Sequence, residues 1–133
     1  MNDSVLRYDL HSHSTWSDGV LLPTEVVARA TQRGVDVLAL TDHDELGGLS
    51  EARTAAQVAG LRLVEGVEIS VTWGAHALHI IGLRVDPSNT VLVEGLRANR
   101  AGRTERAERI SAGLARIGIP DALEGARAYV TNP

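Results

Sequence analysis

The run VDVLALTDH at residues 35–43 is the feature that most restricts how this chain can fold. A short apolar run that ends in polar residues is typical of a strand buried on both faces of a parallel sheet. Further strands are predicted at residues 5–13 and 61–70, with helices at residues 23–33 and 49–59 between the strands. This alternation predicts an α/β fold with a parallel sheet or barrel.

The second half of the chain continues the pattern. Residues 76–85 predict a fourth strand close behind the third, with Gly74 in the connection. Residues 90–117 predict a long helix in which Gly102 is a candidate break, and another helix is predicted to start within residues 120–130. The 133 residues, 44% of them hydrophobic, suit one domain with one core, and there is no internal repeat or linker.

Composition excludes several classes of protein. The sequence has no cysteine, which excludes disulfides and thiolate metal sites. The net charge of −4 argues against a non-specific nucleic-acid coat, so no stable DNA binding is expected. No apolar run approaches the roughly 20 residues that span a bilayer, so no membrane partner is expected. These absences together predict a cytoplasmic protein.

Two of the five histidines lie at the end of the first predicted strand. His11 and His13 would point to the same face of a strand, about 6.6 Å apart along it, so both imidazoles could reach one metal ion. Asp18, in the Gly-containing loop behind them, could reach a neighbouring ion. An isolated H-x-H pattern is more often a pair of ordinary loop histidines, so the prediction depends on the other blocks.

Two further blocks place charged groups at strand ends. The sequence TDHD supplies His43, and its two carboxylates, Asp42 and Asp44, could instead cap the following helix. Glu68 lies on a strand that should be buried, where a carboxylate is stable only beside a cation or another partner. Glu68 is therefore the candidate for a carboxylate that bridges two ions, and Glu65 is interpreted as peripheral.

The block HALHIIGL adds the last two histidines. His76 and His79 would face opposite sides of a strand, so His79 is predicted to be the inward ligand and His76 a rim residue that contacts substrate. Because the carboxyl ends of parallel strands meet at one edge, all these side chains should gather there. Imidazole and carboxylate without thiolate suit Zn, Mn or Fe.

The predicted helix at residues 90–117 carries six arginines. A solvated helix face is the simplest interpretation for most of them. Arg100 and Arg103, however, fall on the apolar stripe defined by Leu96, Ala107, Ile110, Leu114 and Ile117. Arginines on such a stripe should face an anion, and a guanidinium matches the oxygens of a phosphate. Arg103, then Arg100 and Arg106, are the candidate phosphate contacts.

Four blocks in this order, DLHSHSTWSDG, LALTDHD, GVEIS and HIIGL, resemble the PHP (polymerase and histidinol phosphatase) superfamily. The chain is most similar to its stand-alone phosphoesterase branch, which includes 3',5'-nucleoside bisphosphate phosphatases, some of which also trim RNA from the 5' end. The resemblance runs from Tyr8 to about Asn132. It implies a distorted (β/α)7 barrel, and Arg103 and Arg106 match positions where these phosphoesterases carry arginine.

The resemblance also implies two or three divalent ions, Mn, Zn or Fe. His11 and His13 would bind one ion, Glu68 would bridge it to a second ion that His79 also holds, and Asp18 and His43 would hold the third. The family completes this set with later histidines and an aspartate, but no histidine follows His79 here. Residues 1–133 are therefore expected to be the N-terminal portion of a PHP domain, about half a barrel, which alone would bind metal weakly and catalyse little.

The function implied is metal-dependent hydrolysis of a phosphomonoester, with a metal-bound hydroxide as nucleophile and a general acid in the missing half. The favoured substrate is the 3'-phosphate of a nucleoside 3',5'-bisphosphate or a short RNA end, which makes the expected partner a small phosphorylated molecule or RNA. Three alternatives remain: another PHP phosphatase acting on a compound like histidinol phosphate, an amidohydrolase-type hydrolase, and a non-catalytic metal-binding PHP module.

Overall fold

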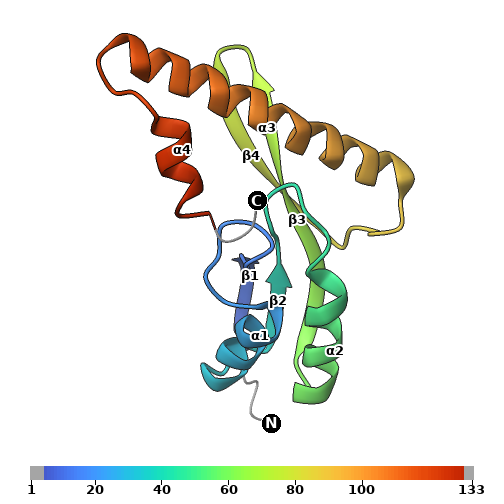
Figure 1. Ribbon diagram of the computed structural model, residues 1–133. Helices are drawn as coiled ribbons and strands as arrows, with labels where there is room; N and C mark the ends of the chain where they lie inside the picture. The colour runs from blue at the N-terminus through green and yellow to red at the C-terminus, as the bar shows by residue number, and fades with distance from the viewer. Residues whose placement is uncertain (1–4, 131–133) are drawn as a thin grey trace.

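A computed structural model describes residues 5–130 of the chain, so the outermost residues of the predicted domain, 1–4 and 131–133, lie outside the described part. The described residues confirm the predicted order of strands and helices (Figure 1). The elements are β1 (Tyr8–Ser12), α1 (Pro23–Gln32), β2 (Val37–Leu40), α2 (Leu49–Ala59), β3 (Arg62–Trp73), β4 (His76–Leu83), α3 (Thr90–Arg116) and α4 (Ala122–Arg127).

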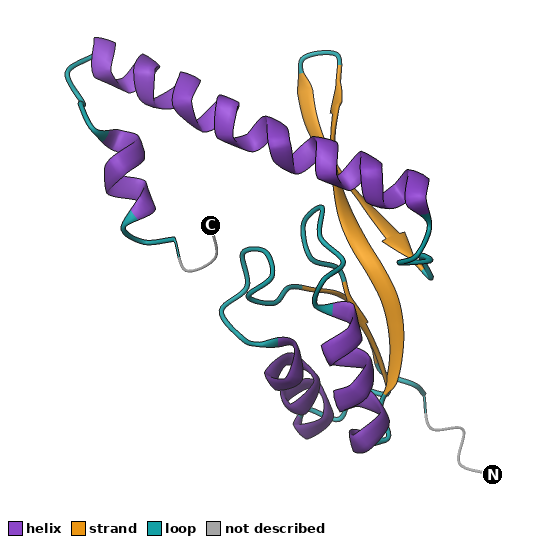
Figure 2. Cartoon of the chain, turned by 45° about the vertical axis from the view of Figure 1, so that its right-hand side comes forward, coloured by secondary structure: helices purple, strands orange, loops and turns teal. Residues whose placement is uncertain are grey.

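The four strands form one sheet in the order β1-β2-β3-β4. The first three strands are parallel, as predicted, and β4 pairs with β3 in an antiparallel hairpin. The hairpin turns at Gly74, whose φ of 61° lies in the left-handed region that favours glycine. The sheet curls without closing, since β1 and β4 form its two edges, and it is therefore part of a barrel (Figure 2).

Helices α1 and α2 pack side by side and build the core with the central strand. All four residues of β2 are buried, as expected for a strand covered on both faces. Val27 and Ala30 of α1 pack in the core cluster with Leu38 and Leu40 of β2 and with the buried face of α2. This core holds the carboxyl ends of β1 and β2 at one edge, where the loops that follow these strands lie.

Helix α3 crosses the β3–β4 hairpin and continues beyond the sheet (Figure 1). It runs unbroken through Gly102, so the candidate break is wrong, because a helix tolerates each interior glycine at a cost of about 1 kcal/mol. Leu96 is the one buried residue of α3, and Ile110, on the same predicted stripe, is 57% exposed. Only the first half of α3 therefore lies against the sheet, and its second half contacts α4 through a hydrogen bond from Leu123 N to Ser111 Oγ at 3.2 Å.

No helix within residues 5–130 combines the length and the apolar character needed to cross a membrane. The strands β1 and β2 are shorter than predicted, and the polar residues that follow each strand lie in loops.

Candidate metal centre

The loops after β1 and β2 are joined to β3 by backbone hydrogen bonds. Thr41 N donates to Ser12 O at 2.8 Å, which ties the end of β2 to the end of β1. Asp44 N then donates to Glu68 O at 2.9 Å, and Glu68 N donates to Asp42 O at 3.2 Å. These bonds extend the parallel pairing by one bridge between His43 and Glu68, and they bring the TDHD block beside the middle of β3.

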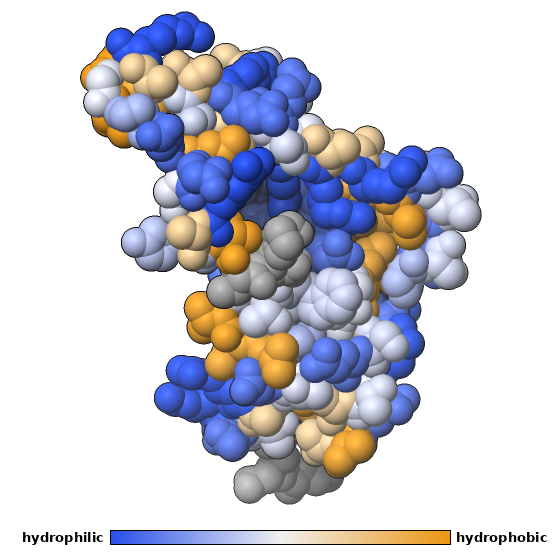
Figure 3. Space-filling model, viewed as in Figure 1, coloured by the Kyte–Doolittle hydropathy of each residue, from blue (hydrophilic) through white to orange (hydrophobic). Residues whose placement is uncertain are grey.

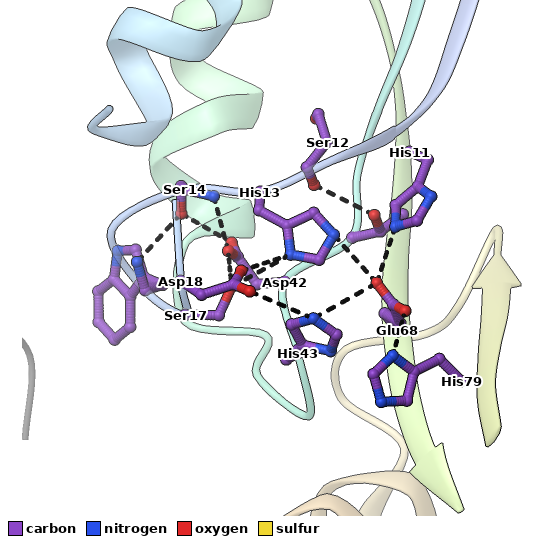
Figure 4. Close-up of polar contacts among 12 residues, drawn as sticks. His11, Ser12, His13, Ser14, Ser17, Asp18, Asp42, His43, Glu68 and His79 are labelled. Atoms are coloured by element: carbon purple, nitrogen blue, oxygen red, sulfur yellow. Dashed lines mark hydrogen bonds and ion pairs between the residues drawn. The ribbon is translucent and has the colours of Figure 1, made fainter. Parts of the chain in front are cut away.

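The side chain of Glu68 lies at the centre of four histidines, and these five residues form the cluster (Figure 4). Its Oε2 lies 2.8 Å from His11 Nε2, 3.0 Å from His13 Nε2 and 3.7 Å from His43 Nε2. Its Oε1 lies 2.9 Å from His79 Nδ1. The two oxygens of one carboxylate thus face different imidazoles, which is the arrangement expected of a carboxylate between two ions.

His79 reaches Glu68 because of the register of the hairpin. Ser70 pairs with His79 and Glu68 pairs with Ile81, so Glu68 and His79 lie diagonally on the same face of the sheet. His76 lies at the other end of this stretch of β4, opposite Trp73 beside the turn, and outside the cluster. His76 is exposed there, and its predicted contact with substrate stays a prediction.

Asp18 supplies a second carboxylate at the cluster. Its two oxygens lie 2.9 Å from His13 Nδ1 and 3.5 Å from His43 Nε2. Among the described residues, three groups bring their donor atoms close enough to hold an ion: His11, His13 and Glu68; His13, Asp18 and His43; and His43, Glu68 and His79. All six predicted ligands, and no other residue, make up these groups, so this donor set fits divalent metal ions that accept imidazole and carboxylate.

The electrostatics of the cluster favour an ionised Glu68. Burial acts to raise the pKa of Glu68, but the hydrogen bond from His11 and the charges of His43, His11 and His13 outweigh it and lower the pKa. A buried carboxylate that stays ionised without a Lys or Arg partner is suited to a cation. Glu65, in contrast, pairs with Arg53 away from the cluster, which agrees with its interpretation as peripheral.

Asp42 has a role that the sequence did not reveal. It does not cap α2, whose first turn begins at Gly48 without a side-chain cap. Its carboxylate is buried and accepts hydrogen bonds from Ser14 N at 2.7 Å, Ser14 Oγ at 2.7 Å and Ser17 Oγ at 2.6 Å. Asp42 therefore fixes the loop between His13 and Asp18, and the alternative of a helix cap is wrong for it.

Asp44 is not a cap either. It is fully buried and accepts hydrogen bonds from Ser70 N at 2.9 Å, Asn99 Nδ2 at 3.0 Å and an Nη of Arg103 at 2.5 Å. Burial acts to raise the pKa of Asp44, but these donors outweigh it and hold the pKa below its usual value. Asn99 and Ser70 had no signal in the sequence, since their contacts depend on how α3 crosses the sheet.

A pocket of about 290 Å³ opens between the cluster and α3. It is lined by Ser17, Asp18, His43, Ser70, His79, Arg103 and Arg106. Figure 3 shows a hollow with hydrophilic side chains between α3 and the loops below it. Arg103 and Arg106 thus lie where a phosphate contact was predicted. Arg100 lies outside the lining, because its guanidinium donates to the Asp44 carbonyl and lies 3.3 Å from a carboxylate oxygen of Glu45.

With this geometry in place, the chain can be compared with known proteins. The family model described as PHP domain matches residues 9–121. The chain belongs to the PHP family. It is 50% identical over 129 residues to a 3',5'-nucleoside bisphosphate phosphatase from Chromobacterium violaceum, covering 97% of this chain and 45% of that protein. It is 48% identical over 122 residues to a 5'-3' exoribonuclease from Haemophilus influenzae, covering 92% of this chain and 44% of that protein.

The fold agrees with this membership. A solved structure described as an amidohydrolase from Chromobacterium violaceum, with bound sulfate and no metal, matches with a TM-score of 0.87 and 49% identity. The match covers 96% of this chain and 45% of that structure. The predicted α/β fold of PHP type is therefore confirmed, and the chain spans about 45% of the length of these relatives.

Proposed function

We propose that the full-length protein is a metal-dependent phosphoesterase that removes the 3'-phosphate of a nucleoside 3',5'-bisphosphate. The observation that carries this proposal is the buried carboxylate of Glu68 among four imidazoles, beside a pocket that two arginines line. Metal ligands on one wall and guanidinium groups on the other suit a phosphoryl group, whose oxygens bind both. The phosphatase from Chromobacterium violaceum supports the choice of substrate.

The described residues would hold two or three ions of Mn, Zn or Fe. His11, His13 and Glu68 would bind the first ion, Glu68 and His79 the second, and Asp18 and His43 the third, in agreement with the three groups of donors. Such ions lower the pKa of bound water and neutralise phosphoryl oxygens. Arg103 and Arg106 would orient the phosphoryl group from the side of α3. Asp42 would keep Asp18 in place through the serines of its loop.

We infer that residues 1–133 are the N-terminal portion of the PHP domain. The matched relatives are about twice as long as this chain, and the described strands form only part of a barrel. The remaining portion would supply further metal ligands and the general acid that protonates the leaving group, because the titratable side chains that line the described pocket are the predicted ligands and arginines.

A second candidate reaction is hydrolysis at the 5' end of RNA. The exoribonuclease from Haemophilus influenzae is nearly as similar to this chain as the phosphatase is, and the pocket is open to solvent beside the cluster. An amidohydrolase-type reaction is a third candidate, raised by the description of the solved structure. The two arginines favour a phosphate over an amide, because a neutral amide carries no charge for a guanidinium to bind.

The experiment is a substrate comparison with the purified full-length protein and Mn²⁺. Release of inorganic phosphate from adenosine 3',5'-bisphosphate, lost with a chelator and restored by metal, is the expected result. Shortening of a 5'-labelled RNA without phosphate release from the bisphosphate would instead favour the exoribonuclease. Metal binding without hydrolysis of either substrate would overturn the proposal and favour a non-catalytic module.

A further inference from the structure

Asp44 has a combination of properties that neither a helix cap nor a metal ligand explains. It is fully buried, and its φ of 53° lies in the left-handed region, which only a few side chains adopt readily. Both of its carboxylate oxygens already have donors: Ser70 and Asn99 on Oδ1, and Arg103 on Oδ2. It belongs to none of the three groups of donors that could hold an ion.

The donors to Asp44 come from two elements far apart in the sequence. Ser70 lies on β3, and Asn99 and Arg103 lie one turn apart on α3. Asn99 also donates to Ser70 O at 2.8 Å, so the amide joins the helix to the strand. Since Leu96 is the one buried residue of α3, these polar contacts carry much of the docking of the helix.

Arg103 is the residue whose position depends most on this contact. Its side chain is 39% exposed and lines the pocket with His43 and His79. One Nη donates to Asp44 Oδ2 at 2.5 Å and lies 3.3 Å from the His43 carbonyl. A guanidinium has five N–H donors in a rigid fork, so this anchor leaves other donors for the pocket.

We propose that Asp44 is a positioning residue, which holds the guanidinium of Arg103 beside the metal ligands in the orientation that binds a substrate phosphate. The proposal rests on the proposed function and adds to it a division of roles between two arginines. Arg103 is a fixed anion contact whose direction Asp44 sets. Arg106 lines the same pocket, and no ion pair of its side chain is present among the described residues, so it is free to follow the substrate.

The test measures binding of inorganic phosphate to the full-length, Mn²⁺-loaded protein by calorimetry. The variants are Asp44→Asn, Arg103→Ala and the double variant, and bound metal is measured in each. Asn tolerates a positive φ, so Asp44→Asn removes the charge without straining the backbone. Asp86→Asn is the matched control, because Asp86 is an exposed loop residue whose partner is Ser88, outside the pocket.

We expect each single variant to weaken phosphate binding about tenfold, as for the loss of a charge-assisted hydrogen bond. The double variant should bind no more weakly than either single variant, since both remove the same contact. Asp86→Asn should bind phosphate like the unchanged protein. Three results would overturn the positioning role. The first is a loss of phosphate affinity in the double variant equal to the product of the two single losses, the second is unchanged phosphate binding in Asp44→Asn, and the third is loss of metal from Asp44→Asn.

A crystal structure of Asp44→Asn separates this proposal from the proposed function. If the unchanged protein neither binds phosphate nor hydrolyses an ester, the proposed function fails, and the position of Arg103 then decides the present proposal. A guanidinium displaced from the His43 carbonyl in the variant supports positioning by Asp44. A guanidinium that stays in place overturns it.

Discussion

At the scale of single residues, the cluster depends on one carboxylate. Glu68 is 5% exposed at its side chain, and each of its oxygens lies within 3.0 Å of a histidine nitrogen. No Lys or Arg side chain of the described residues pairs with this buried carboxylate, so Glu68 is suited to a cation. Divalent ions fit the arrangement, because they bind imidazole and carboxylate together.

Glu68→Gln should therefore remove most of the metal affinity. The amide is neutral and binds metal poorly, so the loss should exceed the roughly 10–100-fold cost of removing a partner outside the ligand shell. Titration of the metal-free protein with Mn²⁺ measures this loss. Glu65→Gln is the matched control on the same strand, since Glu65 pairs with Arg53 instead. Equal affinities in the two variants would show that Glu68 is no ligand.

Gly19→Ala should destabilise the loop that holds His13 and Asp18. A Cβ at Gly19 would lie 2.4 Å from the His13 carbonyl oxygen, so the backbone of the loop must move. The expected loss is about 1–3 kcal/mol of unfolding free energy, together with weaker metal binding. Urea unfolding measures the first effect and metal titration the second. Gly95→Ala, where a Cβ would meet nothing within 4 Å, should show neither loss.

The sequence predicted those site residues whose type is itself typical of metal ligands. Four separate blocks placed histidine or carboxylate at or near predicted strand ends, and the six ligands predicted from them lie together in the structure. Asp42 and Asp44 carry the same local signal as helix caps, and their real partners lie 28 residues earlier for Ser14 and 59 later for Arg103. The contact with Ser14 depends on the pairing of β1 with β2, and the contact with Arg103 depends on the crossing of α3, neither of which a local pattern specifies.

At the scale of elements, hydrophobic periodicity was sufficient to predict the helices and strands that pack in the core. The prediction of a helix at residues 49–59 agrees with α2 at both ends, because its buried residues repeat with helical spacing and Gly60 ends it with a φ of 68°. For α3 the stripe predicted a helix correctly, but the same pattern could not show that Ile110 stays exposed. Glycine alone could not locate a break, since an exposed helix tolerates it.

Gly102→Ala should stabilise the protein, because α3 is regular at this position. A Cβ there meets nothing within 4 Å, and alanine loses less backbone freedom on folding than glycine, by roughly 0.5–1 kcal/mol. The midpoint of urea unfolding should rise by the corresponding amount. Gly60→Ala should lower the midpoint, since the positive φ of Gly60 strains an alanine. The two positions are otherwise matched, because a Cβ at Gly60 also meets nothing within 4 Å. A lower midpoint for Gly102→Ala would instead indicate a break in α3.

At the scale of the whole molecule, apolar side chains remain on the surface of the described residues (Figure 3). Trp73 is 76% exposed, and Ile80 on β4 and Ile117 after α3 are also exposed. The sheet has two edges, and unpaired edges are sites where further strands or other chains add. These surfaces agree with a chain that spans about 45% of the length of its relatives.

The cluster is also partly exposed to solvent. The side chains of His11 and His79 are 55% and 51% exposed, whereas those of His13 and His43 are 18% and 17% exposed. Ligands exposed to water keep more side-chain freedom, and ordering them upon metal binding costs free energy. The first and second ions, which His11 and His79 would bind, should thus be held less firmly by residues 1–133 alone than by the longer polypeptide.

We therefore expect the full-length protein to bind Zn²⁺ at least about tenfold more tightly than residues 1–133 alone, which corresponds to roughly 1.4 kcal/mol. Titration against a fluorescent chelator measures both affinities. In the same samples, diethyl pyrocarbonate should modify His11 and His79 in the shorter chain, and the longer polypeptide should protect them. Equal affinities and equal modification would contradict the expectation, because the described residues would then form the complete site. Tighter binding with protection would place the missing part of the ligand shell on the open side of the cluster, against His11 and His79.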